Sequence, residues 1–149
     1  MRDKIGPRPP GFDAEAIARA EAALKGLADN FQAWMNEDVE KLEAARQAAR
    51  LTGFDEAKTE ELFCRAHDVK GLGTTYEYPL ATAIAGSLCK LIDGVEARAL
   101  ARKNPSLIEA HVDAIRAIVR DRVKNAEDPV GKAIAATLRT HVYDLMGPD

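Results

Sequence analysis

The sequence has few aromatic residues, few cysteines and no long apolar run. Aromatic residues make up 5% of the 149 residues while alanine is abundant, and this composition favours helices over sheets. No segment approaches the roughly 20 consecutive apolar residues that crossing a bilayer requires. The first residues, Met1 to Gly11, are polar and proline-rich, unlike a signal peptide. We therefore expect a soluble, cytoplasmic, all-α protein that has no membrane partner.

The two cysteines and three histidines lack the spacing of a disulfide framework or a metal site. Cys64 and Cys89, in a chain with no export signal, are expected to be reduced thiols packed on helices. Cys64 and His67 make only half of a metal-binding set, and the remaining candidate ligands are far apart in sequence. We expect no metal. His111 and His141 lie near apolar helix stripes and are interpreted as histidines at the edge of the core.

Other signals for ligand classes are also missing. The formal net charge is −3, and the Lys and Arg residues are interspersed with Asp and Glu, so we expect no nucleic-acid partner. No glycine-rich phosphate loop is present, which argues against an ATP site of the chain's own. No alternation of strands and helices with an acidic cluster is present, which argues against a receiver-type fold.

Helical periodicity and break residues divide the chain into a tail and six helices. Residues 1–12 are expected to be a flexible N-terminal tail, and residues 13–149 a single helical domain. Gly94 is a point at which the fourth helix can be interrupted. The short connections favour an antiparallel four-helix bundle with additional N- and C-terminal helices. The expected helices cover residues 14–28, about 30–51, 55–73, 80–101, 105–123 and 129–146.

One segment of the third expected helix has residue types that indicate chemistry. Lys70 follows His67 by one helical turn, so an imidazole and an ammonium group share a helix face. Gly71 removes a side chain beside them. A glycine inside a helix costs about 1 kcal/mol relative to alanine and usually has a reason in packing or access. The lysine would offset negative charge on a phosphorylated imidazole, and the glycine would leave room for a partner.

The run His67-Asp68-Val69-Lys70-Gly71 is similar to the core motif of histidine-containing phosphotransfer domains. The resemblance implies a four-helix bundle whose exposed histidine relays phosphoryl groups to or from receiver-domain aspartates in two-component signalling. His67 would be the phosphoacceptor, Lys70 the electrostatic support and Gly71 the clearance for docking. It implies no cofactor on this chain, because magnesium belongs to the partner, a receiver domain of a response regulator or hybrid histidine kinase.

The surface around the motif is expected to meet that partner. Its other members are Cys64, Asp68, Thr74 and Thr75. The segment Thr74–Pro79 differs from the small residues and further glycine that many family members carry after the histidine. A second hypothesis remains open, in which the chain is a non-catalytic helical adaptor that binds a signalling partner through the same face. Exposure of His67 favours phosphotransfer, whereas burial of its ring in the core favours the adaptor.

Overall fold

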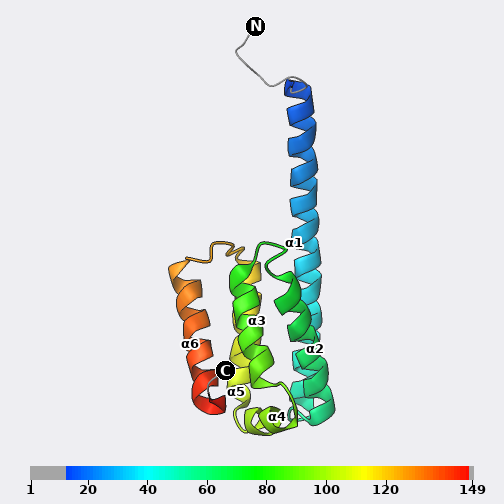
Figure 1. The fold of residues 1–149 in the computed structure, drawn as a ribbon. Helices are drawn as coiled ribbons and strands as arrows, with labels where there is room; N and C mark the ends of the chain where they lie inside the picture. The colour runs from blue at the N-terminus through cyan, green and yellow to red at the C-terminus, as the bar shows by residue number, and fades with distance from the viewer. Residues whose placement is uncertain (1–12, 148–149) are drawn as a thin grey trace. The chain divides into compact units, whose positions relative to one another are not determined.

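The structure is a computed structural model in which residues 13–147 are described, and this part of the chain contains six α-helices and no strand (Figure 1). The predicted all-α class is confirmed. No helix within residues 13–147 combines the length and the apolar composition that crossing a membrane requires. The helices are α1 (Ala14–Leu51), α2 (Glu56–Leu72), α3 (Pro79–Leu91), α4 (Val95–Arg102), α5 (Pro105–Arg120) and α6 (Pro129–Met146).

Helix α1 replaces two predicted helices, so the predicted break near residue 29 is wrong. The sequence predicts a second helix that starts at about residue 30, but α1 continues through Asp29 without interruption. The Asp29 carboxylate instead pairs with Lys25 one turn earlier, at 3.5 Å from its Nζ. An i,i+4 pair of this kind supports helix geometry, and neither residue breaks the helical backbone.

The other helix boundaries follow the cap and proline signals in the sequence. Asp55 caps α2, its carboxylate accepting from the backbone N–H of Lys58 at 2.8 Å. Prolines occupy the first position of α3, α5 and α6, where a missing N–H has no cost. The predicted helix over residues 80–101 is interrupted, because Gly94 has a φ of +94° that favours glycine and separates α3 from α4.

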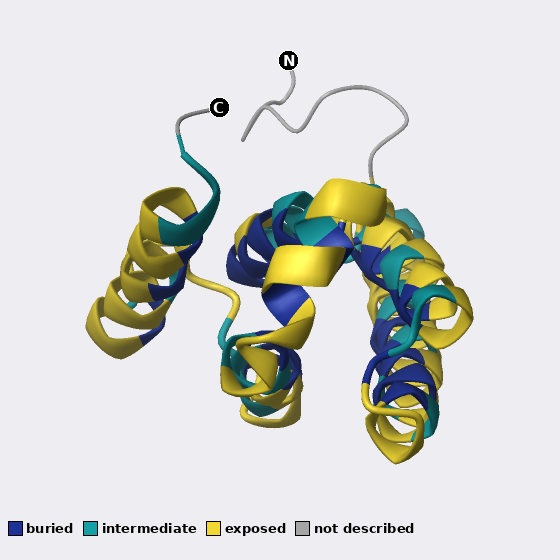
Figure 2. Ribbon diagram, turned by 90° about the horizontal axis from the view of Figure 1, so that it is seen from below, coloured by how far each residue is buried: buried dark blue, intermediate teal, exposed yellow. Residues whose placement is uncertain are grey.

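The chain divides into two compact units, Met1–Ala33 and Trp34–Asp149. The second unit contains a core in which α3 is the most central element, packing against α2, α5 and α6. Figure 2 shows buried residues on the sides of these helices that face one another. The prediction of one domain over residues 13–149 stays a prediction, and the predicted tail, residues 1–12, lies outside the described residues.

An ion cluster around the buried Arg46 joins α1 to α5. Arg46 is only 3% exposed and donates to the carboxylates of three acidic residues. It reaches Glu43 at 2.8 Å on its own helix, and Glu109 at 3.0 Å and Asp113 at 2.9 Å on α5. Each of the three guanidinium nitrogens has a carboxylate partner, which compensates for the loss of hydration on burial. This cluster fixes α5 beside the part of α1 that belongs to the second unit.

Candidate functional site

Helix α2 exposes His67 while its neighbours anchor the helix in the core. Leu62, Ala66 and Val69 are fully buried, at 0% exposure each, whereas His67 and Lys70 are exposed. The Asp55 cap and the apolar stripe together set the rotation of the helix, so the imidazole lies on a flank next to the core. Of the two outcomes considered for His67, the structure gives the exposed one.

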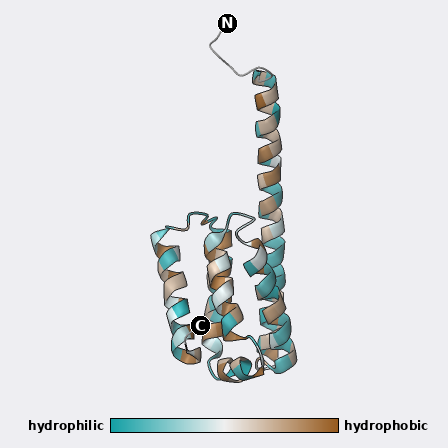
Figure 3. Cartoon of the chain, in the orientation of Figure 1, coloured by the Kyte–Doolittle hydropathy of each residue, from teal (hydrophilic) through white to brown (hydrophobic). Residues whose placement is uncertain are grey.

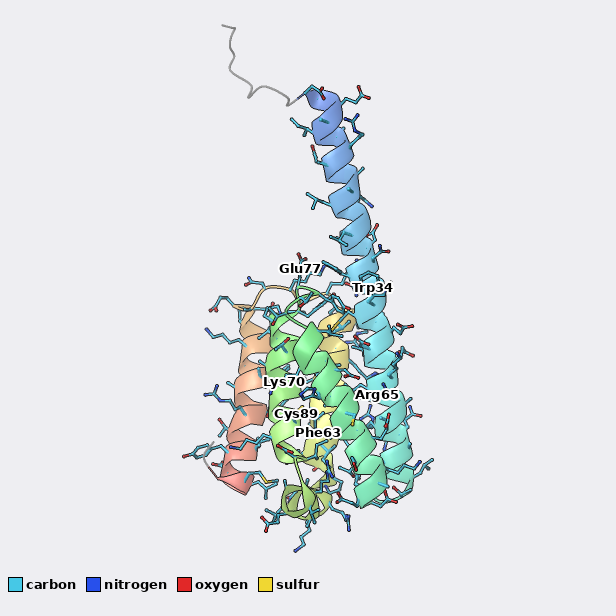
Figure 4. The ribbon with its side chains drawn as sticks, turned by 45° about the vertical axis from the view of Figure 1, so that its right-hand side comes forward. Trp34, Phe63, Arg65, Lys70, Glu77 and Cys89 are labelled. Carbon is cyan, nitrogen blue, oxygen red and sulfur yellow. The ribbon has the colours of Figure 1, made fainter. Side chains whose placement is uncertain are left out.

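His67 borders a polar surface hollow between α2 and α3. The hollow has a volume of about 610 Å³, and α2 contributes Phe63, His67 and Lys70 to its lining. The other wall comes from the second half of α3 and the residues directly after it. Figure 4 shows Phe63, Lys70 and Cys89 gathered at this junction. The residues on that wall are Gly86, Cys89, Lys90 and Asp93.

The charged groups of the hollow favour an anion beside His67. Lys70 and Lys90 contribute two ammonium groups from two different helices, and Asp93 contributes one carboxylate. The imidazole can carry a covalent group on one ring nitrogen, and the ammonium groups lie on the same hollow to offset negative charge on it. No cluster of potential metal ligands occurs within residues 13–147.

Gly86 lies beside the Lys70 stem. A methyl group built at Gly86 would lie 3.9 Å from Cε of Lys70, an ordinary contact distance. The lysine stem therefore runs across the glycine on its way to the hollow. A methyl group would fit at this position, so the packing does not require glycine there.

The buried Cys89 thiol is not a nucleophile of the site. Burial raises the pKa of Cys89 to about 11, and the charge of Lys70 opposes this shift only in part. The thiol is therefore protonated at neutral pH, and thiolate chemistry is excluded there. Within that wall Cys89 contributes a neutral group between the charged side chains of Lys90 and Asp93 and the glycine at position 86.

Phe63 lines the hollow beside His67 and is itself contacted by Arg98. The Phe63 ring lies one turn before His67, with ring centroids 6.1 Å apart and planes tilted by 36°. The Arg98 guanidinium carbon lies 5.7 Å from the Phe63 ring centroid. Arg98 is held in turn by the carbonyl of Ile92 at 2.9 Å and by the Glu56 carboxylate at 2.5 Å. These contacts join the end of α3, the start of α2 and α4 behind the imidazole.

Gly71 leaves open space on the exposed side of α2. No atom lies within 4 Å of a methyl group built at this position, so the packing of the chain does not require glycine there. Gly73 differs, because a methyl group there would clash with the hydroxyl of Thr82 on α3. The fold thus explains Gly73, whereas no contact within the described residues requires a glycine at position 71.

The predicted partner-surface residues are not all brought together. Cys64 and Asp68 are exposed on α2 but do not line the hollow. Asp68 lies 3.7 Å from Arg65 and influences Asp38 of α1, whose pKa is raised mainly by burial and further by this neighbouring carboxylate. Asp68 therefore faces α1 rather than α3.

The two predicted threonines lie beyond the end of α2. Thr74 and Thr75 are exposed and neither lines the hollow. The Thr74 hydroxyl is 3.2 Å from the hydroxyl of Thr82, so it takes part in closing α2 onto α3. Their contact with a partner stays a prediction.

The other histidines have different surroundings. His111 is fully buried rather than at the core edge, with Nε2 2.8 Å from the Ser87 hydroxyl and Nδ1 2.7 Å from the Leu107 carbonyl oxygen. His141 is exposed on α6 and lines a mostly apolar groove between α5 and α6. Neither has a lysine beside it in the way that His67 has Lys70.

The residues of the hollow that the sequence did not predict all lie on its α3 side, opposite the motif on α2. Gly86, Cys89, Lys90 and Asp93 repeat at helical spacing, as Phe63, His67 and Lys70 do on α2. The one sequence feature that could have indicated them is the position of Lys90 and Asp93 at the end of an otherwise apolar segment. Their pairing with α2 depends on how the two helices pack, which periodicity alone does not give.

Comparison of the chain with family models, with curated proteins and with solved structures gives no match. Function is therefore inferred from the geometry around His67 and from the resemblance of its motif.

Proposed function

We propose that this protein is a histidine phosphotransfer protein that accepts a phosphoryl group on His67 and relays it to or from a receiver-domain aspartate in two-component signalling. The observation that carries the proposal is an exposed imidazole on a cationic hollow lined by Lys70 and Lys90. A histidine that served only packing would gain nothing from two cations on the same hollow. The protein is a phosphoryl carrier with no ATP site of its own.

The reaction is a reversible displacement at phosphorus. A lone pair on one imidazole nitrogen of His67 forms the N–P bond as the P–O bond of the partner's aspartyl phosphate breaks. The aspartate leaves as a carboxylate, and the imidazole releases the proton of its other nitrogen to solvent. Magnesium in the receiver domain supplies charge stabilisation on the partner's side. Return of the phosphoryl group to an aspartate runs the same steps backwards.

The neighbouring residues support this chemistry in different ways. The Lys70 ammonium group, on the same hollow as His67, offsets the charge of the phosphorylated ring. Phe63, backed by Arg98, lies beside the imidazole and gives the site an aromatic neighbour on the same helix. Gly71 leaves the approach to the ring unobstructed.

The arrangement of the helices fits the proposed role. We infer that α2, α3, α5 and the part of α1 from Trp34 onward form an antiparallel four-helix bundle, with α6 as an additional helix. In such a bundle the phosphoacceptor lies midway along a helix, and a receiver domain docks against two neighbouring helices. Docking of this kind is weak and transient, since the carrier must release one partner to meet the next. A cytoplasmic location follows from these partners.

The proposal is tested by transfer from a panel of phosphorylated receiver domains to the purified chain. The native protein and His141→Gln, which removes the other exposed histidine, should both accept label, whereas His67→Gln should accept none. Failure of every donor to label the native protein would favour the non-catalytic adaptor. Equal labelling of all three proteins would place the acceptor elsewhere.

A matched pair at Gly71 tests the docking side. Gly71→Ala should transfer at close to the native rate, because open space surrounds the added methyl group. Gly71→Arg should slow transfer about 10-fold or more by obstructing approach, while its circular dichroism spectrum stays native. Equal rates for the two variants would contradict a docking surface over this glycine.

A further inference from the structure

The first unit, Met1–Ala33, carries an apolar seam that the phosphotransfer proposal does not use. Ile17, Ala20, Leu24 and Leu27 follow one another at alternating spacings of three and four residues along α1. This is the spacing of a and d positions in a coiled coil, a narrower pattern than the broad stripe of a helix that packs on a globular core. Figure 3 shows hydrophobic residues recurring among hydrophilic ones along this part of α1.

The seam is exposed along its whole length. Every residue from Ile17 to Asn30 is exposed, and Leu24 is 66% and Leu27 45% accessible. Leucines at successive turns of a helix are seldom left in water, and a helix of about 20 residues gains much of its stability from packing an apolar face. The segment also contains Gly26, which lowers its intrinsic helix propensity further.

Charges on this segment lie away from the seam. Glu15 pairs with Arg19 at 3.1 Å and Lys25 pairs with Asp29 at 3.5 Å, each within the helix itself. All four side chains occupy the outer positions b, c and f of the heptad that begins at Ile17. Intrahelical pairing satisfies them, so they need no opposite charge from another protein.

The positions that flank the seam select an identical helix as the occupant. At the e and g positions stand three alanines and one asparagine, and Glu21 is the single charge. Small uncharged flanks let two helices approach closely, and they present no charge pattern for choosing a different partner. Two copies of one seam match in length and spacing, as a two-fold interface requires. The flanking residues are Ala16, Glu21, Ala23, Ala28 and Asn30.

We propose that residues 14–33 pair with the same segment of a second copy of this chain, forming a short two-helix coiled coil. Two heptads with one alanine among four seam positions make a small interface, so the dimer is expected to be concentration-dependent. This pairing is independent of phosphoryl transfer, because it uses residues of the first unit only.

The test is sedimentation velocity of the full chain from about 1 µM to about 1 mM, the range in which small interfaces dissociate. The native protein should shift with concentration from the 16.2 kDa chain mass to twice that mass. Leu24→Glu should raise the dissociation constant at least about 100-fold, since two charges would enter the seam. Ala22→Glu, which adds the same charge on the outer face, should dimerise like the native protein.

Three results would overturn the proposal. The first is a native chain that remains a monomer at every concentration. The second is equal dimerisation of Leu24→Glu and Ala22→Glu. A third is a dimer that persists when residues 14–33 carry both Leu24→Glu and Leu27→Glu, because the contact would then lie elsewhere. Transfer of label to His67 is measured on the same samples, and its failure alone would bear on the phosphotransfer proposal and not on pairing.

Discussion

Acid should destabilise this protein through His111. The ring is fully buried, and its Nδ1–H donates to the Leu107 carbonyl oxygen while Nε2 accepts from the Ser87 hydroxyl. Because the Ser87 hydroxyl can donate to Nε2 or accept from it, burial is what disfavours the charged ring. Burial lowers the pKa of His111 from 6.5 to about 4, although the Leu107 carbonyl opposes the shift.

The sign and size of the effect follow from this pKa. The unfolded chain takes up a proton on the imidazole near pH 6.5, whereas the folded protein does so only near pH 4. The contribution of the neutral ring is complete above pH 6.5 and is lost as the pH falls from 6.5 to about 4. The loss is about 2 kcal/mol at pH 5 and about 3 kcal/mol at pH 4.

The assay is urea unfolding followed by circular dichroism at pH 7 and pH 5. Carboxylates titrate in the same range, so the informative quantity is the difference between variants. The native protein and His141→Gln should lose about 2 kcal/mol more between these pH values than His111→Gln, which cannot be protonated there. Equal losses in all three proteins would refute the reasoning. Nuclear magnetic resonance of the native His111 ring gives an independent check, since titration near pH 6.5 would also refute it.

Three further outcomes follow from the packing. Replacing Arg46 with alanine should lower the free energy of unfolding by about 3 kcal/mol, because three carboxylates lose the cation that they share. An unchanged urea midpoint would contradict the stabilising role of Arg46. Gly73→Ala should cost about 1–3 kcal/mol through its clash with Thr82, seen as a lower Tm, and a native Tm would show that α2 and α3 have room to separate. Iodoacetamide at pH 8 should alkylate the exposed Cys64 and leave the buried Cys89 unmodified until the protein unfolds, which peptide mass mapping would show. Equal modification of the two cysteines in the folded protein would contradict the burial of Cys89.

Local signals predicted much of the secondary structure. Asp55 and the prolines that begin α3, α5 and α6 act within a few residues of themselves, so the sequence is sufficient to place these helix starts. The exception was Asp29, which has the residue type of an N-cap but forms an i,i+4 pair inside α1. Residue type alone does not distinguish these two uses.

The candidate site was predicted on one side only. The exposure of His67 and Lys70 follows from their offset relative to the buried stripe of α2. The other side of the site comes from helices whose position depends on tertiary packing, and it includes Gly86, Lys90 and, behind Phe63, Arg98. Their separation from the motif along the sequence does not tell how far from it they lie in space. Recognition of these residues therefore required the fold.

The burial of His111 shows the same limit. Its apolar neighbours on α5 indicated the core, but the sequence did not reveal the hydroxyl on α3 that allows the ring to be fully buried. A polar group in the core depends on its partner, and that partner is 24 residues away in the chain.

The most direct test of the account is the chemical identity of the phosphorylated residue. After incubation with a phosphorylated receiver domain, the label on the native protein should be lost in acid and retained in alkali, as a phosphoramidate requires, and His67→Gln should carry none. A label that survives acid, or one that persists in His67→Gln, would contradict the assignment of His67 as the phosphoacceptor.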